Sequence, residues 1–236
     1  MNSSSTLRRL KMASAVAAVA AVSSEVSSAA SIAVNFMGDG YQALGLAVTA
    51  TAYGVAAEQW TNVDSADGAS STSVSGVSIS WTSPNDWTWN QPSTPGDQEV
   101  NYGYLDDSTN AANTPTITLT GLSAWLSGLG APTYTLQIIQ STDNGTGFTA
   151  TDVFTVSGGT VLGQLTNSTT GSGKIGGASS ILTGLTSDTL FLDTQVRNGL
   201  TRGTIAGVII TPIPEPAVTL LSGLGMLGLL RRRRSS

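Results

Sequence analysis

The sequence contains neither cysteine nor histidine, and both absences limit what the chain can do. Without cysteine there is no disulfide, so packing alone must hold the fold together. Without histidine, the commonest general base, the Ser-His-Asp triad and nearly every zinc or copper site are excluded. We therefore expect that the protein is not an enzyme. Paired carboxylates, as in glycoside hydrolases, are the main catalytic chemistry that such a composition leaves open.

Positive charge is scarce between the two ends of the chain. Residues 31–211 contain three basic side chains, Lys174, Arg197 and Arg202, against thirteen acidic ones, which gives a net charge near −10. So acidic a surface repels phosphate backbones, and we expect no nucleic-acid partner. The length of this region suits a single domain with a sizeable core.

The C-terminal end combines three features in a fixed order. Pro214-Glu215-Pro216 precedes the apolar run 217–230, and four arginines follow. A helix of 14 residues is about 21 Å long, whereas the hydrocarbon core of a bilayer is about 30 Å thick. The arginines would stay on the cytoplasmic side. The run therefore predicts a short transmembrane segment that attaches the protein to the inner membrane temporarily.

This tail resembles the PEP-CTERM sorting signal of Gram-negative bacteria. The resemblance implies export, recognition by a membrane-embedded exosortase as partner, and a final place at the cell surface or outside the cell. It also implies an association with exopolysaccharide and biofilm. The residues that carry the motif are Pro214, Glu215, Pro216, Arg231, Arg232, Arg233 and Arg234.

The N-terminal end has the order of a secretory signal peptide. A basic stretch with Arg8, Arg9 and Lys11 precedes the apolar run 12–22, and small residues reach Ala30. Charged, apolar and small segments in this order predict export and cleavage after Ala30. The expected organisation is a signal peptide at 1–30, a domain at 31–211 and a sorting signal at 212–236 that includes the segment 217–230.

The central region reads as a series of short strands. It is rich in small and β-branched residues, and apolar residues alternate along it as they do in half-buried strands. Turn-forming clusters separate the alternating sets. We predict an all-β fold, an antiparallel β-sandwich of jelly-roll type, with an N-terminal signal helix and a short C-terminal hydrophobic helix. The clearest sets are Val77/Ile79/Trp81, Ile117/Leu119, Tyr134/Leu136/Ile138 and Leu190/Leu192.

Three segments fit the alternation less well. The Ala-rich stretch 42–57 could form a helix or a strand. The apolar stretch 122–129 around Trp125 suggests a helical turn that covers one end of the sandwich. The Gly/Ser-rich stretch 171–180 reads as a loop.

An aromatic cluster is the strongest candidate for a binding site. Five of the fourteen aromatic residues lie within positions 81–104. In an extended strand, Trp87 and Trp89 share one face, and so do Tyr102 and Tyr104. Such pairs could stack on sugar rings, fill the core of the sandwich, or contact another protein. The candidate glycan-binding residues are Trp81, Trp87, Trp89, Tyr102 and Tyr104.

Acidic residues suggest two further kinds of site. A structural calcium ion could bind Asp64 and Asp67, Asp106 and Asp107, or Asp143 with Asn144, although none of these forms an EF-hand loop. We assign no metal ligand from the sequence and expect no other cofactor. A glycosidase pair could be drawn from a second set, Glu58, Asp97 and Glu99.

Together these features predict an exported, non-enzymatic protein of the cell surface or extracellular matrix that associates with exopolysaccharide. The alternative is a carbohydrate-binding module with a defined aromatic site at 81–104. A carboxylate-dependent glycan hydrolase is the third reading.

Overall fold

A computed structural model of the chain describes residues 31–38, 47–64, 68–88, 94–107, 114–142, 148–158, 161–171, 176–196 and 203–215. The predicted signal peptide at 1–30 and the apolar segment 217–230 with its arginines lie outside these residues. None of the helices in the described ranges is long and apolar enough to span a bilayer.

The described chain is mostly strand. Two α-helices and one 3₁₀ turn interrupt it. In chain order the elements are β1 (Ile32–Phe36), η3 (Ala57–Gln59), β2 (Trp60–Val63), β3 (Gly68–Val74), β4 (Val77–Ser83), β5 (Asn85–Thr88), α2 (Asp97–Asn101), β6 (Gly103–Asp106), β7 (Thr116–Thr120), α3 (Leu122–Leu129), β8 (Thr133–Thr142), β9 (Phe148–Ser157), β10 (Val161–Gly171), β11 (Gly176–Leu185), β12 (Thr189–Val196) and β13 (Gly207–Ile213).

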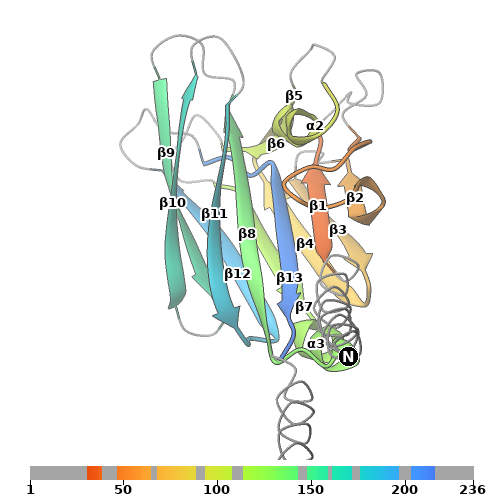
Figure 1. Cartoon of the computed structure of the whole chain (residues 1–236). Coiled ribbons are helices and arrows are strands. Elements are labelled where there is room, and N and C mark those ends of the chain that lie inside the picture. The colour runs from red at the N-terminus through yellow and green to blue at the C-terminus, as the bar shows by residue number, and fades with distance from the viewer. Residues whose placement is uncertain are drawn as a thin grey trace, which may run out of the picture.

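Two large sheets face each other (Figure 1). One has the order β11-β8-β13-β1-β2, the other β10-β9-β12-β7-β4-β3, and β5 and β6 form a separate pair. Consecutive strands from β7 to β13 cross repeatedly between the sheets, as in jelly rolls. The predicted antiparallel β-sandwich is confirmed, with one departure: β1 and β2 pair in parallel.

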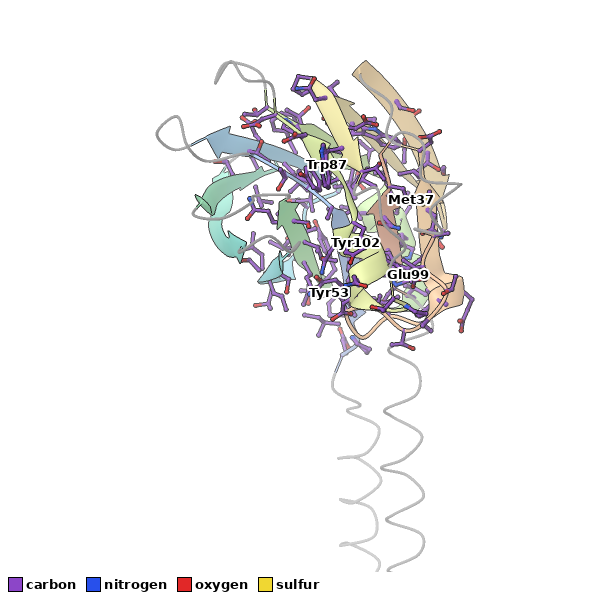
Figure 2. The ribbon with its side chains drawn as sticks, turned by 90° about the horizontal axis from the view of Figure 1, so that it is seen from above. Met37, Tyr53, Trp87, Glu99 and Tyr102 are labelled. Carbon is purple, nitrogen blue, oxygen red and sulfur yellow. The ribbon has the colours of Figure 1, made fainter. Side chains whose placement is uncertain are left out.

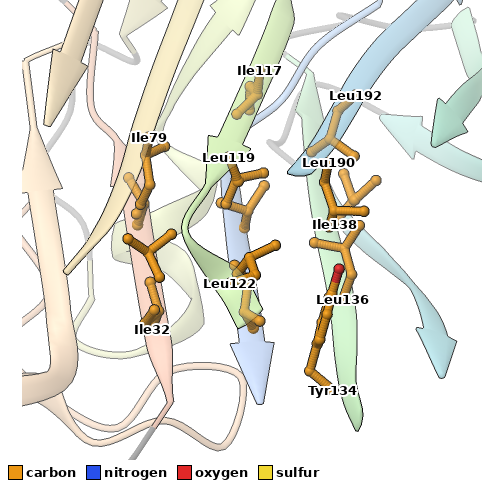
Figure 3. Close-up of a cluster of buried hydrophobic side chains, with 14 of the residues drawn as sticks. Ile32, Ile79, Ile117, Leu119, Leu122, Tyr134, Leu136, Ile138, Leu190 and Leu192 are labelled. Atoms are coloured by element: carbon orange, nitrogen blue, oxygen red, sulfur yellow. The ribbon is translucent and has the colours of Figure 1, made fainter. Parts of the chain in front are cut away.

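The main core lies between the sheets (Figure 3). In β4, buried and exposed positions alternate strictly, and Val77, Ile79 and Trp81 point inward. Ile117 and Leu119 of β7 continue the same layer. Burying each such side chain contributes about 1.5–3 kcal/mol, so this alternation specifies which face of each strand turns inward.

A second apolar cluster covers the outer face of the five-stranded sheet. All five residues of β1 are buried, because Ile32, Val34 and Phe36 face the main core while Ala33 belongs to the outer cluster. Segment 47–59, α2 and the β5–β6 pair lie over this face. The outer cluster consists of Ala33, Val48, Ala52, Val55, Trp60, Val100, Tyr104, Ile139, Ala206 and Ile209.

The three less regular segments have different outcomes. The predicted helical turn at 122–129 is confirmed as α3, which buries Trp125 and ends at Gly130 with a left-handed φ of 63°. The part of 42–57 that the structure describes, 47–56, forms neither helix nor strand and contains only an isolated bridge between Ala52 and Val55. The prediction of a loop at 171–180 is wrong for 176–180, which begins β11 and pairs with β8. The glycine and serine residues of this stretch show no alternation of apolar side chains, so the sequence did not indicate a strand there.

Candidate functional site

Trp81 belongs to the core. Its side chain is 3% exposed and packs edge-on against Phe36, with ring centroids 5.3 Å apart at an interplanar angle of 73°. T-shaped pairs of this kind contribute beyond the area they bury. The position is therefore unsuited to stacking on a sugar, because both ring faces are covered by protein.

Trp87 and Tyr104 form a stacked pair outside the five-stranded sheet. They are cross-strand partners in β5 and β6, with ring centroids 5.2 Å apart and an interplanar angle of 23°. Tyr104 has no exposed surface, whereas Trp87 is half-buried. Tyr104 thus supports the Trp87 ring from below the surface and is not itself open to a ligand.

The predicted aromatic residues are therefore divided. Tyr102 is half-buried at the C-terminal end of α2, and Trp89 lies outside the described residues. The four that the structure describes do not share one surface. Of these four, Trp87 and Tyr102 keep partial exposure (Figure 2).

A buried carboxylate fastens segment 47–59 to α2. Glu99 is 2% exposed, and its Oε1 accepts a 2.6 Å hydrogen bond from the Thr49 hydroxyl. Its Oε2 accepts hydrogen bonds of 2.9 Å from the backbone N–H groups of Thr49 and Gly96. The bond to Gly96 is the half of a capping box that an acidic third helical residue supplies. All of these partners are groups of the protein itself.

Asp97 and Asn101 hold Tyr53 in a left-handed backbone conformation, with φ at 48°. The Tyr53 N–H donates a 2.6 Å hydrogen bond to Asp97 Oδ1, and its hydroxyl donates one of 2.6 Å to Asn101 Oδ1. Burial raises the pKa of Tyr53 to about 12, a rise that Asn101 opposes and the Asp97 charge reinforces. The Tyr53 hydroxyl is therefore a donor at neutral pH.

The acidic candidates for calcium are separated or internally bonded. Asp106 Oδ1 accepts a 3.0 Å hydrogen bond from the Asp107 N–H, and Asp107 Oδ2 accepts one of 3.0 Å from Gly203. Asp64 is exposed, while Asp67, Asp143 and Asn144 lie outside the described ranges. Within those ranges no three acidic residues gather as metal ligands would.

The start of the sorting tail is exposed at the end of the last core strand. β13 ends at Ile213, and both Pro214 and Glu215 are exposed. Ser31 and Thr211 share a hydrogen bond of 3.2 Å between their hydroxyl oxygens, so the predicted cleavage site after Ala30 adjoins the same strand end.

Comparison with protein families identifies this tail. The family model described as the PEP-CTERM protein-sorting motif matches residues 212–234. The chain ends in a PEP-CTERM sorting motif. The resemblance inferred from Pro214, Glu215, Pro216 and the arginines is thereby confirmed. The motif implies an exported protein that an exosortase sorts, attached to the membrane through its tail until processing.

Comparisons over the whole chain are weaker, and no curated protein matches it. A Bacillus subtilis protein of known crystal structure aligns with TM-score 0.36 and 12% identity over 78% of this chain, which spans 40% of that protein. A family 35 carbohydrate-binding module from Clostridium thermocellum aligns with TM-score 0.34 and 13% identity, covering 61% of this chain and 97% of the module. A CBM35 from Cellvibrio japonicus aligns with TM-score 0.33 and 16% identity, covering 46% of this chain and 72% of that one.

Thr49 and Tyr53 were not singled out from the sequence. Both lie in the stretch 42–57, where small residues gave no clear period. Gly54, directly after Tyr53, was a local sequence signal of a turn, and both residues have positive φ in the structure.

Proposed function

We propose that the sandwich is a non-enzymatic component of the cell surface or extracellular matrix that associates with exopolysaccharide after sorting. The observation that carries this proposal is the PEP-CTERM motif at 212–234, which begins within the last core strand and continues into exposed residues. The sorting machinery would therefore act on a tail beside a folded domain, and the domain is the part that reaches the final location.

The use of the acidic side chains supports a non-enzymatic role. Glu99 is enclosed and accepts three hydrogen bonds from Thr49 and Gly96. Asp97 is bonded to the Tyr53 backbone. A glycosidase needs one carboxyl group to protonate the leaving group and another to act as base or nucleophile, both in contact with substrate. Glu99 serves instead to attach segment 47–59.

A defined carbohydrate-binding site is a second candidate, and Trp87 favours it. The ring is half-buried, and its stack on Tyr104 fixes its orientation. Asn85, two residues before Trp87 and on the same face of β5, would supply a polar group to a sugar bound there. Stacking on a fixed ring costs little side-chain entropy, which suits recognition of a polysaccharide chain.

Binding of the processed protein to exopolysaccharide from the producing cells tests both candidates. Trp87→Ala removes the half-buried ring of β5, and Phe191→Ala, at a residue 40% exposed on β12 of the other sheet, is the matched control. A defined site predicts saturable binding that weakens at least about tenfold in Trp87→Ala and persists in Phe191→Ala.

The remaining outcomes separate the two candidates. Binding that neither substitution weakens supports diffuse association without a site at Trp87. No binding by the unaltered protein contradicts the association with exopolysaccharide. Release of new reducing ends from the polysaccharide contradicts the non-enzymatic role.

A further inference from the structure

The end of the sandwich that carries α3 contains an open pocket of about 480 Å³. We call this part of the molecule the α3 end; it comprises α3, the turn between β3 and β4, and Ser31. In Figure 1 it lies opposite α2, at the end where β13 terminates. The pocket is lined by Ser31, Ser75, Gly76, Ala124, Trp125, Gly128 and Leu129.

The sorting tail leaves the domain at this same end. Ser31 lines the pocket and is hydrogen-bonded to Thr211 of β13. Ala217, where the apolar run begins, follows Ile213, the end of β13, by four residue steps. Even fully extended, they reach no more than about 14 Å. While the apolar run is in the bilayer, the α3 end must therefore lie close to the lipid headgroups.

The α3 end has the surface chemistry for that position. Residues 72–78 and 121–132 contain no charged side chain, although the domain as a whole is strongly acidic. Leu129 is 44% exposed at the end of α3, and Trp125 borders the pocket. Exposed leucine is favoured at the boundary between water and lipid, whereas Trp125 itself is buried in the main core. Asp188 lies at the opposite, N-terminal end of α3, where it accepts a hydrogen bond from the Ser123 N–H.

The acidic groups of α2 and β6 are placed away from the membrane by the same geometry. Asp97, Glu99 and Asp106 belong to these elements, which lie at the other end of the sandwich (Figure 1). Bilayer surfaces that carry anionic lipids repel negative charge within a Debye length, about 8–10 Å at physiological salt. An orientation with the α3 end toward the bilayer keeps this repulsion small.

We propose that the α3 end is a membrane-facing surface, on which Leu129 and the rim of the pocket contact lipid headgroups while the tail still anchors the protein. Processing by the exosortase then ends this contact by removing the anchor. This orientation rests on the sorting motif and is independent of any binding to polysaccharide.

The absence of cysteine allows a direct test with single fluorescent labels. The full-length protein is produced in cells without an exosortase, and Leu129→Cys is labelled in inner-membrane vesicles that contain lipids with a nitroxide on the headgroup. Ser179→Cys is the control, because Ser179 is exposed and lies far along the sheet from the tail. Ser179 pairs with Ile139 of β8. Ile213, beside the tail, pairs with Thr133 at the start of β8. Six residues of strand place the control about 20 Å farther along β8.

The proposal predicts that lipid nitroxide quenches the label at 129 at least about threefold more strongly than the label at 179. Ala124→Cys, at an exposed position on the pocket rim that leaves Leu129 in place, should behave like Leu129→Cys. Equal quenching at all three positions, or stronger quenching at 179, overturns the membrane-facing orientation. Loss of the precursor from the membrane fraction would overturn the anchoring by the tail as well.

Discussion

Glu99 is the residue on which the outer layer depends most directly. It joins the first turn of α2 to segment 47–59 through Thr49 and Gly96. A buried carboxylate is tolerated when donors surround it, because the hydrogen bonds replace those that water would have made. Removing the acceptor leaves the buried Gly96 N–H without a partner, and an unpaired buried donor costs more stability than the bond itself contributes.

Glu99→Ala should therefore lower the free energy of unfolding by about 2–3 kcal/mol, because the buried Gly96 N–H and the part-buried Thr49 N–H lose their acceptor. Glu99→Gln should cost less, about 1 kcal/mol, since its amide oxygen can still accept both N–H bonds and its NH₂ group can donate to the Thr49 hydroxyl. Urea unfolding of the processed protein measures both. Glu58→Ala, at an exposed position in η3, should change stability by less than about 0.5 kcal/mol. Equal effects of Glu58→Ala and Glu99→Ala would contradict this role.

Tyr53 gives the outer layer a dependence on alkaline pH. Its pKa is about 12 in the folded protein, against 10.0 ordinarily, so the unfolded chain loses the phenolic proton first as pH rises. The contribution of Tyr53 to stability is thus complete below pH 10.0 and is lost progressively between pH 10.0 and about 12. Tyr53→Phe should flatten the fall in unfolding free energy over this window. Part of the fall should remain, because burial also raises the pKa of Tyr134. An unchanged slope in Tyr53→Phe would contradict the assignment.

Among the elements, β6 lies unusually close to the end of β1. A Cβ atom added at Gly103, the first residue of β6, would lie 2.1 Å from the Met37 carbonyl oxygen, whereas Gly128 in α3 has nothing within 4 Å of such an atom. Thr88 of β5 also donates a 2.9 Å hydrogen bond to the Met37 carbonyl. Glycine at position 103 is what allows the β5–β6 pair to close over the outer face.

Gly103→Ala should destabilise the fold by about 1–3 kcal/mol or more, because the backbone at Met37 has to move. Gly128→Ala, in the open position on α3, should be neutral or stabilising by up to about 1 kcal/mol, because alanine is the better helix former. The thermal unfolding temperatures of the two variants, compared with that of the unaltered protein, measure both effects. A Gly103→Ala protein as stable as the unaltered one would show that β6 does not approach β1 this closely.

The elements also show how far the sequence could be read. Alternation in Val77/Ile79/Trp81 and Tyr134/Leu136/Ile138 predicted strands and their buried faces correctly, because a half-buried strand exposes every second residue. The same rule could not show that β1 is buried on both faces, since its second cover comes from segment 47–59 and α2. For the same reason, the sequence indicated that Trp87 and Tyr104 lie on strands, but it could not show that the buried Tyr104 ring supports the Trp87 ring. The spacing of apolar residues along one strand does not indicate which of its side chains a segment distant in the sequence will cover.

At the scale of the whole molecule, the two ends of the domain lie together. β1 and β13 are antiparallel neighbours, and Ser31 is bonded to Thr211. The predicted cleavage site after Ala30 and the PEP-CTERM motif at 212–234 therefore adjoin the same end of the sandwich. An exosortase that acts there would work at the end of the sandwich opposite α2 and β5, the strand that carries Trp87 (Figure 1).

If the C-terminal tail is a sorting signal, an exosortase removes it from the exported domain. Intact-mass measurement with cell fractionation, in hosts with and without the exosortase, tests it most directly. We expect loss of residues 1–30 in both hosts. In the host that has the enzyme, we expect loss of the tail and departure of the protein from the inner membrane. A tail that survives in both hosts, with the protein held in the inner membrane, would show that residues 217–230 are a plain anchor and not part of a sorting signal.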